Sequence, residues 1–107
     1  MPGQVFLVDD EKHIRLAGAQ MLELAGYEVR AFSSAAQALP LLNPDWCGVI
    51  VSDIRMPDLD GLEFLQRALA IDGGLPVILV TGHGDINMAV TAIRDGAYDF
   101  LEKPFAP

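Results

Sequence analysis

Short apolar runs alternate with segments of helical periodicity along the whole chain, and this alternation constrains the fold more than any other feature. Five runs have the length of β-strands and are bounded by Gly, Pro, Asp or Ser, at residues 5–8, 27–32, 47–52, 76–80 and 98–101. Between them, at 14–25, 35–42, 61–68 and 86–93, apolar residues recur three and four positions apart. The pattern predicts the element order βαβαβαβαβ.

The third and fourth runs are almost continuously apolar, as in Val49, Ile50 and Val51. Such runs indicate strands that are buried on both faces, which a parallel sheet covered by helices provides. We therefore predict an α/β fold. With 107 residues, 51% of them hydrophobic, the chain is sized for one domain spanning 1–107.

Glycine, proline and capping residues support the predicted boundaries. Gly26 and Gly96 lie where helices commonly end in a left-handed residue. Pro40 falls inside the second helical segment, where it removes a backbone hydrogen bond and should kink or shorten the helix. Capping side chains are available for two helices, from Ser33 or Ser34 for the second and from Asp85 for the fourth.

Polar residues follow four of the five predicted strands. Asp9 and Asp10 follow the first, Asp53 the third, Thr81 the fourth and Lys103 the fifth. In an open parallel sheet, the carboxyl ends of the strands form the binding crevice, so these side chains should meet there. The sequence thus predicts three carboxylates, one hydroxyl and one ammonium at a single edge.

Three gathered carboxylates repel one another, since two like charges ~4 Å apart cost on the order of 4 kcal/mol at an effective dielectric near 20. Oxygen ligands without His or Cys favour Mg²⁺ as the balancing cation. An aspartate can also act as a nucleophile towards phosphorus, with the metal and an ammonium neutralising the transferring group. The predicted site therefore suits phosphoryl acceptance.

Charge and composition exclude several other classes. With 15 acidic and 7 basic residues the net charge is −8, which disfavours direct binding to nucleic acid. The lone Cys47 is expected to be a small buried thiol, and this cysteine usage suits a reducing cytoplasm. We see neither a targeting segment nor an apolar run near the ~20 residues that a membrane span needs.

Four motifs occur in order along the chain. They are Val8-Asp9-Asp10-Glu11, the segment 51–61 (VSDIRMPDLDG), the segment 80–85 (VTGHGD) and the segment 96–105 (GAYDFLEKPF). In sequence and spacing they resemble the motifs of two-component response-regulator receiver domains, and the resemblance covers essentially the whole chain. Within that family, the stretch around His83 and the tail look most similar to the nitrogen-regulator class, especially the C4-dicarboxylate transport regulators.

The resemblance implies a flavodoxin-like, doubly wound fold with a five-stranded parallel sheet in the order 2-1-3-4-5. It also implies a fifth helix after the last strand, which this chain lacks, so we expect exposed apolar surface beside the first and fifth strands and a tendency to self-associate. The implied partners are a sensor histidine kinase, an output ATPase and DNA-binding domain of the same full-length protein, and a second copy in a homodimer.

The family's functional residues carry over to matching positions. Asp53 matches the phosphoacceptor, and Asp10, Asp53 and the backbone carbonyl of Arg55 match the Mg²⁺ ligands, with Asp9 holding the metal through water. Thr81 and Lys103 match the hydroxyl and ammonium that contact the phosphoryl oxygens. Phe100 matches the switch aromatic, which is expected to move inward when Thr81 moves, as the fourth helix and fifth strand are reshaped. The peptide bond before Pro104 matches the family's cis peptide.

Other readings fit less well. A haloacid-dehalogenase-type phosphatase needs a second acid two residues after its nucleophile, and a flavin or nucleotide module needs a phosphate loop where Asp9 and Asp10 stand. An EF-hand needs an acidic or amide residue where Met56 stands. A pseudo-receiver shares the fold but acts as a constitutive interaction module. It would lack part of the set Asp9, Asp10, Asp53, Thr81 and Lys103, which is complete here. His83 and the Arg55 side chain could modulate attack of water on the phosphoryl group, but we expect His83 to be a solvated loop histidine and assign neither residue a catalytic role. We expect no enzyme activity beyond the domain's own phosphorylation and dephosphorylation.

Overall fold

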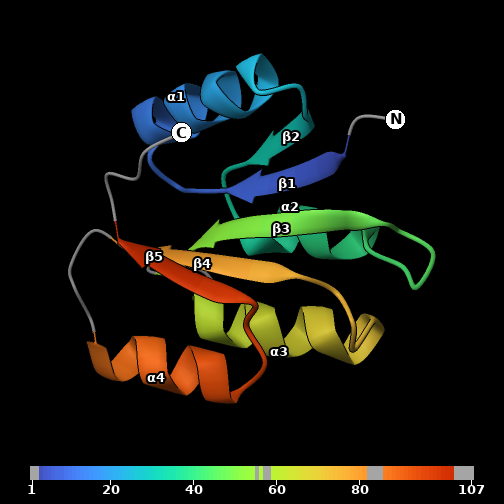
Figure 1. Ribbon diagram of the computed structural model, residues 1–107, viewed down its shortest axis with the longest axis vertical. Coiled ribbons are helices and arrows are strands. Elements are labelled where there is room, and N and C mark those ends of the chain that lie inside the picture. The colour runs from blue at the N-terminus through green and yellow to red at the C-terminus, as the bar shows by residue number, and fades with distance from the viewer. Residues whose placement is uncertain (1–2, 55, 57–58, 82–85, 103–107) are drawn as a thin grey trace.

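A computed structural model describes residues 3–54, 56, 59–81 and 86–102. Strands and helices alternate as the sequence pattern predicted, with a short 3₁₀ helix, η1, after the second helix (Figure 1). The elements are β1 (Gln4–Val8), α1 (Lys12–Leu24), β2 (Glu28–Phe32), α2 (Ala35–Ala38), η1 (Leu39–Leu41), β3 (Gly48–Asp53), α3 (Gly61–Ile71), β4 (Val77–Thr81), α4 (Ile86–Arg94) and β5 (Asp99–Glu102).

All five strands pair in parallel, in the order β2-β1-β3-β4-β5, which confirms the predicted topology. Helices cover both faces of this sheet. Gly18 of α1 lies against Leu7, whereas the neighbouring Phe6 and Val8 pack in one core with Phe64 of α3. Because successive side chains of a strand point to opposite faces, α1 and α3 must lie on opposite sides of the sheet.

The core on the α3 face is closely packed. Ile50, Phe64, Leu65 and Leu79 are all fully buried there. Burying one such side chain contributes roughly 1.5–3 kcal/mol relative to leaving it exposed. This face therefore supplies much of the free energy that holds the strand ends in place.

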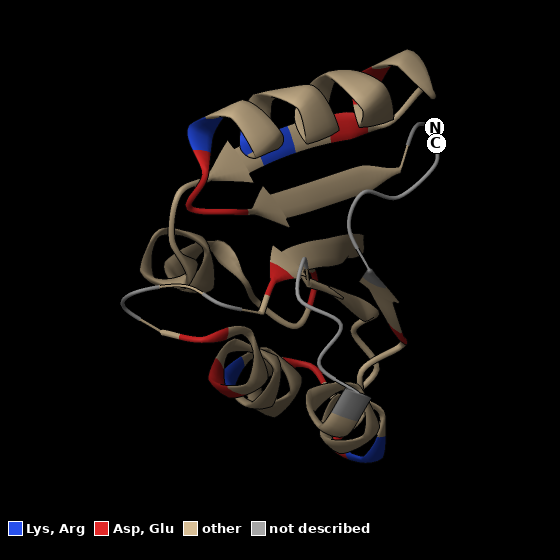
Figure 2. Cartoon of the chain, turned by 90° about the vertical axis from the view of Figure 1, so that its left-hand side faces the viewer, with Lys and Arg blue, Asp and Glu red and all other residues tan. Residues whose placement is uncertain are grey.

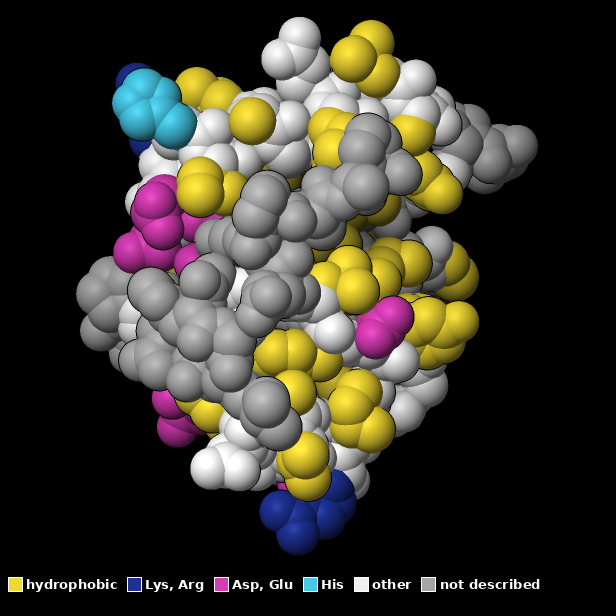
Figure 3. Space-filling view, turned by 60° about the vertical axis from the view of Figure 1, so that its left-hand side comes forward, with side chains coloured by type: hydrophobic (Ala, Val, Ile, Leu, Met, Phe, Trp, Pro, Cys, Tyr) yellow, Lys and Arg dark blue, Asp and Glu magenta, His cyan; other side chains and the backbone are white. Residues whose placement is uncertain are grey.

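The α1 face is covered less completely. Val49, Val51, Ile78 and Leu101 alternate with core residues along their strands, and all four are only half-buried. Among the described elements, only α1 lies over this face, towards β1 and β2. Figure 3 shows several hydrophobic side chains at the molecular surface.

The prediction of a buried Cys47 is wrong, because the thiol is exposed. β3 begins one residue later, at Gly48, so Cys47 belongs to the preceding turn, where Sγ donates to the Asp45 carbonyl at 3.4 Å. The neighbouring Trp46 takes the covered position, with its ring 4.3 Å from the Phe6 ring between centroids. A Cβ on Gly48 would overlap the Trp46 ring, so this packing requires glycine.

The helix boundaries follow the predicted signals with one exception. Gly26 and Gly96 have φ values of 100° and 108°, in the left-handed region where glycine is favoured. Pro40 shortens the second helix, which is a single α turn continued by η1. Ser34 occupies the N-cap of α2 without a capping side-chain bond. The predicted cap at Asp85 lies outside the described residues.

A cap that the sequence analysis missed begins α3. Asp60 is the N-cap, and its Oδ1 accepts the Glu63 N–H at 2.9 Å. This bond satisfies one of the free amides at the helix end. It also fixes where α3 starts, close to the end of β3.

Asp60→Ala should lower the free energy of unfolding by about 1 kcal/mol, because it leaves the Glu63 amide without its cap. Urea denaturation followed by circular dichroism measures the change. Asp60→Ser keeps a capping oxygen and should stay within a few tenths of a kcal/mol of the parent. Equal losses in the two variants would contradict a capping role.

Candidate functional site

The three predicted carboxylates meet at one edge of the sheet. One oxygen from each of Asp9, Asp10 and Asp53 lies within 4.8 Å of the others. The register explains this, because Val8 pairs with Ser52 and the next residues of the two parallel strands are Asp9 and Asp53. Figure 2 shows the acidic segments at the turn before α1 and at the end of β3.

Hydrogen bonds hold the turn between β1 and α1. The Asp9 N–H donates to the Phe32 carbonyl of β2 at 3.0 Å, and Asp9 Oδ1 accepts the Glu11 N–H at 2.9 Å. The Asp9 carbonyl accepts from Arg15 Nη1 at 2.9 Å. Asp9 is 3% exposed, whereas Asp10 faces solvent. The turn therefore presents one buried and one accessible carboxylate.

Asp53 is held from two sides. The next residue, Ile54, donates its N–H to the Val80 carbonyl of β4 at 3.0 Å and accepts the Gly61 N–H at 2.8 Å. A Cβ on Gly61 would lie 2.8 Å from the Asp53 carbonyl oxygen and 2.7 Å from Ile54 Cα. The start of α3 can approach β3 this closely only because residue 61 is glycine, so Gly61 helps to position the carboxylate.

The donor set fits a hard divalent cation. All the ligand atoms that these residues offer are carboxylate oxygens, which Mg²⁺ and Ca²⁺ prefer, and two of the residues are at least nine-tenths buried. Three like charges at this spacing repel one another, and a bound cation would remove that repulsion. The cluster is thus suited to a hard divalent cation such as Mg²⁺, with the exposed Asp10 on its solvent side.

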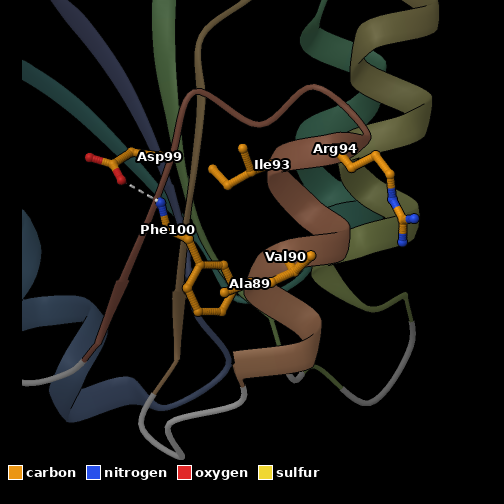
Figure 4. Close-up of a pocket in the computed structure, with 6 residues that line it drawn as sticks. All are labelled: Ala89, Val90, Ile93, Arg94, Asp99 and Phe100. Carbon is orange, nitrogen blue, oxygen red and sulfur yellow. Dashed lines mark hydrogen bonds between the residues drawn. The ribbon is translucent and has the colours of Figure 1, made fainter.

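The predicted switch residues lie on the neighbouring strands. Thr81 ends β4 and is fully buried. Phe100 of β5 pairs with Leu79, two residues before Thr81, so all three side chains belong to the same face of the sheet. The half-buried Phe100 ring points from β5 towards α4, beside Ala89 and Val90 (Figure 4).

A groove separates α4 from β5. Its volume is about 510 Å³, and Val90 and Ile93 on its helical side are 58% and 49% exposed. Arg94 and Asp99 also line the groove, but their charged ends point away from it, and Asp99 Oδ1 accepts the Phe100 N–H at 2.7 Å (Figure 4). This surface lies next to Phe100, so a movement of that ring would change its shape.

Several predicted site residues lie outside the described part of the chain. These are Lys103, Pro104, Arg55 and His83. Their predicted roles stay predictions. Conversely, the sequence analysis missed Arg15 and the close approach of Gly61, although Gly61 belongs to a quoted motif. Arg15 carries no signal of its own, since an arginine on a helix is ordinary until its partner is seen.

Comparisons with known proteins agree on one family. The response regulator receiver domain matches residues 5–107. The C4-dicarboxylate transport transcriptional regulatory protein DctD of Rhizobium meliloti is 59% identical over 102 residues, which are 95% of this chain and 22% of that regulator. The chain therefore spans about a fifth of this relative's length.

Solved structures extend the agreement to the fold. A receiver domain from Clostridium thermocellum superposes with a TM-score of 0.91 at 33% identity, covering 97% of this chain and 84% of that one. The beryllofluoride-activated NtrC4 receiver domain dimer superposes with a TM-score of 0.88 at 39% identity, covering 96% of this chain and 85% of that one. Among the described residues, no helix is both long and apolar enough to cross a membrane.

Asp10→Asn should stabilise the metal-free domain, because it removes one of three mutually repelling charges. For a domain of this size each kcal/mol shifts Tm by about 4–8 °C. Millimolar Mg²⁺ should raise Tm clearly for the parent and less for Asp10→Asn. Differential scanning fluorimetry measures both effects.

Asp45→Asn is the matched control, since Asp45 is exposed in the turn before β3, at the opposite end of that strand. It should leave the Mg²⁺-dependent rise in Tm unchanged. A Tm for Asp10→Asn that responds to Mg²⁺ as strongly as the parent would exclude Asp10 as a ligand.

Proposed function

The chain belongs to the response regulator receiver domain family, and on that basis we propose that it is a phosphorylation-dependent switch with Asp53 as phosphoacceptor. The observation that carries the proposal is the carboxylate cluster of Asp9, Asp10 and Asp53 at the ends of β1 and β3. Receiver domains are signalling domains rather than enzymes acting on separate substrates. The help that this domain gives to its own phosphorylation is part of the proposal.

In the proposed reaction, a carboxylate oxygen of Asp53 attacks the phosphorus of a phosphohistidine on a sensor kinase. The P–N bond breaks, its electron pair returns to the imidazole nitrogen, and an aspartyl phosphate forms. Mg²⁺ neutralises charge on the transferring group when it is bound. Asp10, Asp53 and the Arg55 carbonyl are its proposed ligands, with Asp9 holding it through water.

The proposed switch starts at Thr81 and Lys103. The phosphoryl group carries about −1.5 to −2 charges, and each hydrogen bond to a charged group contributes roughly 1.5–3 kcal/mol. Two such bonds approach the ~5.5 kcal/mol that takes a two-state equilibrium from 1:99 to 99:1. Movement of Thr81 towards the phosphoryl group would let Phe100 turn inward and reshape the α4–β5 groove.

The proposed partners follow from the family and from the surface. A cytoplasmic sensor kinase supplies the phosphoryl group, and the reshaped groove controls an output ATPase and DNA-binding domain of a longer, sigma-54-dependent regulator. The net charge of −8 argues against direct binding to DNA. Residues 1–107 act as one receiver domain, and the similarity to the NtrC4 receiver domain dimer supports a homodimer as a further proposed assembly.

Incubation with acetyl phosphate and Mg²⁺ should add one phosphoryl group to the domain, measured as an intact mass increase. Asp53→Asn should abolish this addition, because its amide cannot act as the nucleophile. Asp45→Asn should accept the phosphoryl group as the parent does. Labelling that persists in Asp53→Asn, or that needs no divalent cation, would overturn the assignment.

Thr81→Ala should still accept phosphate at Asp53 but lose most of the change at the α4–β5 groove, because the hydroxyl that follows the phosphoryl oxygens is gone. Amide chemical shifts of residues 89–94, recorded before and after phosphorylation, measure the change. Thr81→Ser keeps the hydroxyl and should retain the phosphorylation-dependent change at the groove. If Thr81→Ala shows the same shifts as the parent, the coupling scheme is wrong.

A further inference from the structure

Arg15 links α1 to the carboxylate cluster through the main chain. Its Nη1 donates to the Asp9 carbonyl at 2.9 Å, and the side chain is half-buried. Arg15 is the fourth residue of α1, and helical side chains lean towards the N-terminus of their helix. The guanidinium therefore lies against the turn that carries Asp9 and Asp10.

The carbonyl that Arg15 holds belongs to the peptide unit between Asp9 and Asp10. A peptide unit is planar, so fixing its oxygen also fixes the direction in which the Asp10 N and Cα leave the strand. The Asp9 N–H and Oδ1 are already bonded, to Phe32 and Glu11. The exposed Asp10 side chain depends on this backbone for its place beside Asp53.

Lys12 and Arg15 place two positive charges near the N-terminus of α1, where the N-cap residue Glu11 is negative. The unfavourable interaction of the two cations with the helix dipole is therefore partly offset at the helix end itself. Because Arg15 bonds a carbonyl, this bond occupies no carboxylate oxygen of the cluster.

We propose that Arg15 is a positioning residue, which orients the Asp9–Asp10 peptide so that the Asp10 and Asp53 carboxylates can bind the same Mg²⁺. The inference rests on the proposed function, in which this cluster holds the metal. It concerns the geometry of the ligands, and Arg15 itself touches neither the metal nor the phosphoryl group.

Mg²⁺ titration of Arg15→Gln tests the proposal, because positioning and charge predict opposite results. Loss of positioning should raise the Mg²⁺ Kd about ten- to hundredfold, as for other groups that orient metal ligands. Loss of a positive charge near a cation site would instead lower the Kd. The Glu11 amide resonance reports binding directly, since this N–H donates to Asp9 Oδ1.

Lys12→Gln is the matched control, because it removes the same charge from the same helix end at an exposed position. Its Kd should equal that of the parent or fall. Arg15→Lys keeps the charge with shorter reach and should give a Kd between those of the parent and Arg15→Gln. If Arg15→Gln does not fold, a raised Kd in Arg15→Lys supports the proposal and an unchanged one overturns it.

An unchanged or lowered Kd in folded Arg15→Gln overturns the inference about Arg15. Failure of the proposed function is a separate result, in which the parent binds Mg²⁺ and yet gains no phosphoryl mass. A parent that binds no Mg²⁺ contradicts both.

Discussion

The parallel pairing of β1 with β3 is the constraint on which the rest of the site depends. It places Asp9 beside Asp53, two like charges that would separate if they were not fixed to the ends of buried strands. Burial of Val8 and Ile50 on the same strands holds the two ends together against that repulsion. The hydrophobic core and the acidic site are therefore coupled, because the core keeps the carboxylates at a spacing where a cation can bind between them.

The same sheet joins the site to the groove beside α4. Ile54, directly after Asp53, bonds the Val80 carbonyl; Val80 precedes Thr81 and pairs with Leu101, the neighbour of Phe100. Only β4 thus lies between the strand that ends at Asp53 and the strand that carries Phe100. A small displacement at the end of β4 has a short route to a surface where Val90 and Ile93 are already exposed.

Much of this arrangement could be predicted from the sequence, because strand ends in a parallel sheet meet at one edge whatever the details of packing. That rule brought Asp9, Asp10 and Asp53 together correctly. It could not give contacts that depend on how a helix is set against the sheet, such as the bond from Arg15. The burial of Cys47 was predicted wrongly, because an apolar neighbourhood does not show where a strand begins. The large Trp46 ring, and not the Cys47 side chain, packs on the core at this point. The described residues do not test Lys103.

The position of Trp46 has a practical consequence for measuring this domain. It is the only tryptophan, and it packs on Phe6 just before β3, whose last residue is Asp53. At about 3.3 Å per residue, the strand separates the indole from the carboxylate by roughly 20 Å. The protein thus carries its single indole fluorophore at the end of the sheet away from the acidic cluster. Its emission should change on global unfolding and change little on metal binding. The stability of the domain can therefore be followed by tryptophan fluorescence without interference from bound metal.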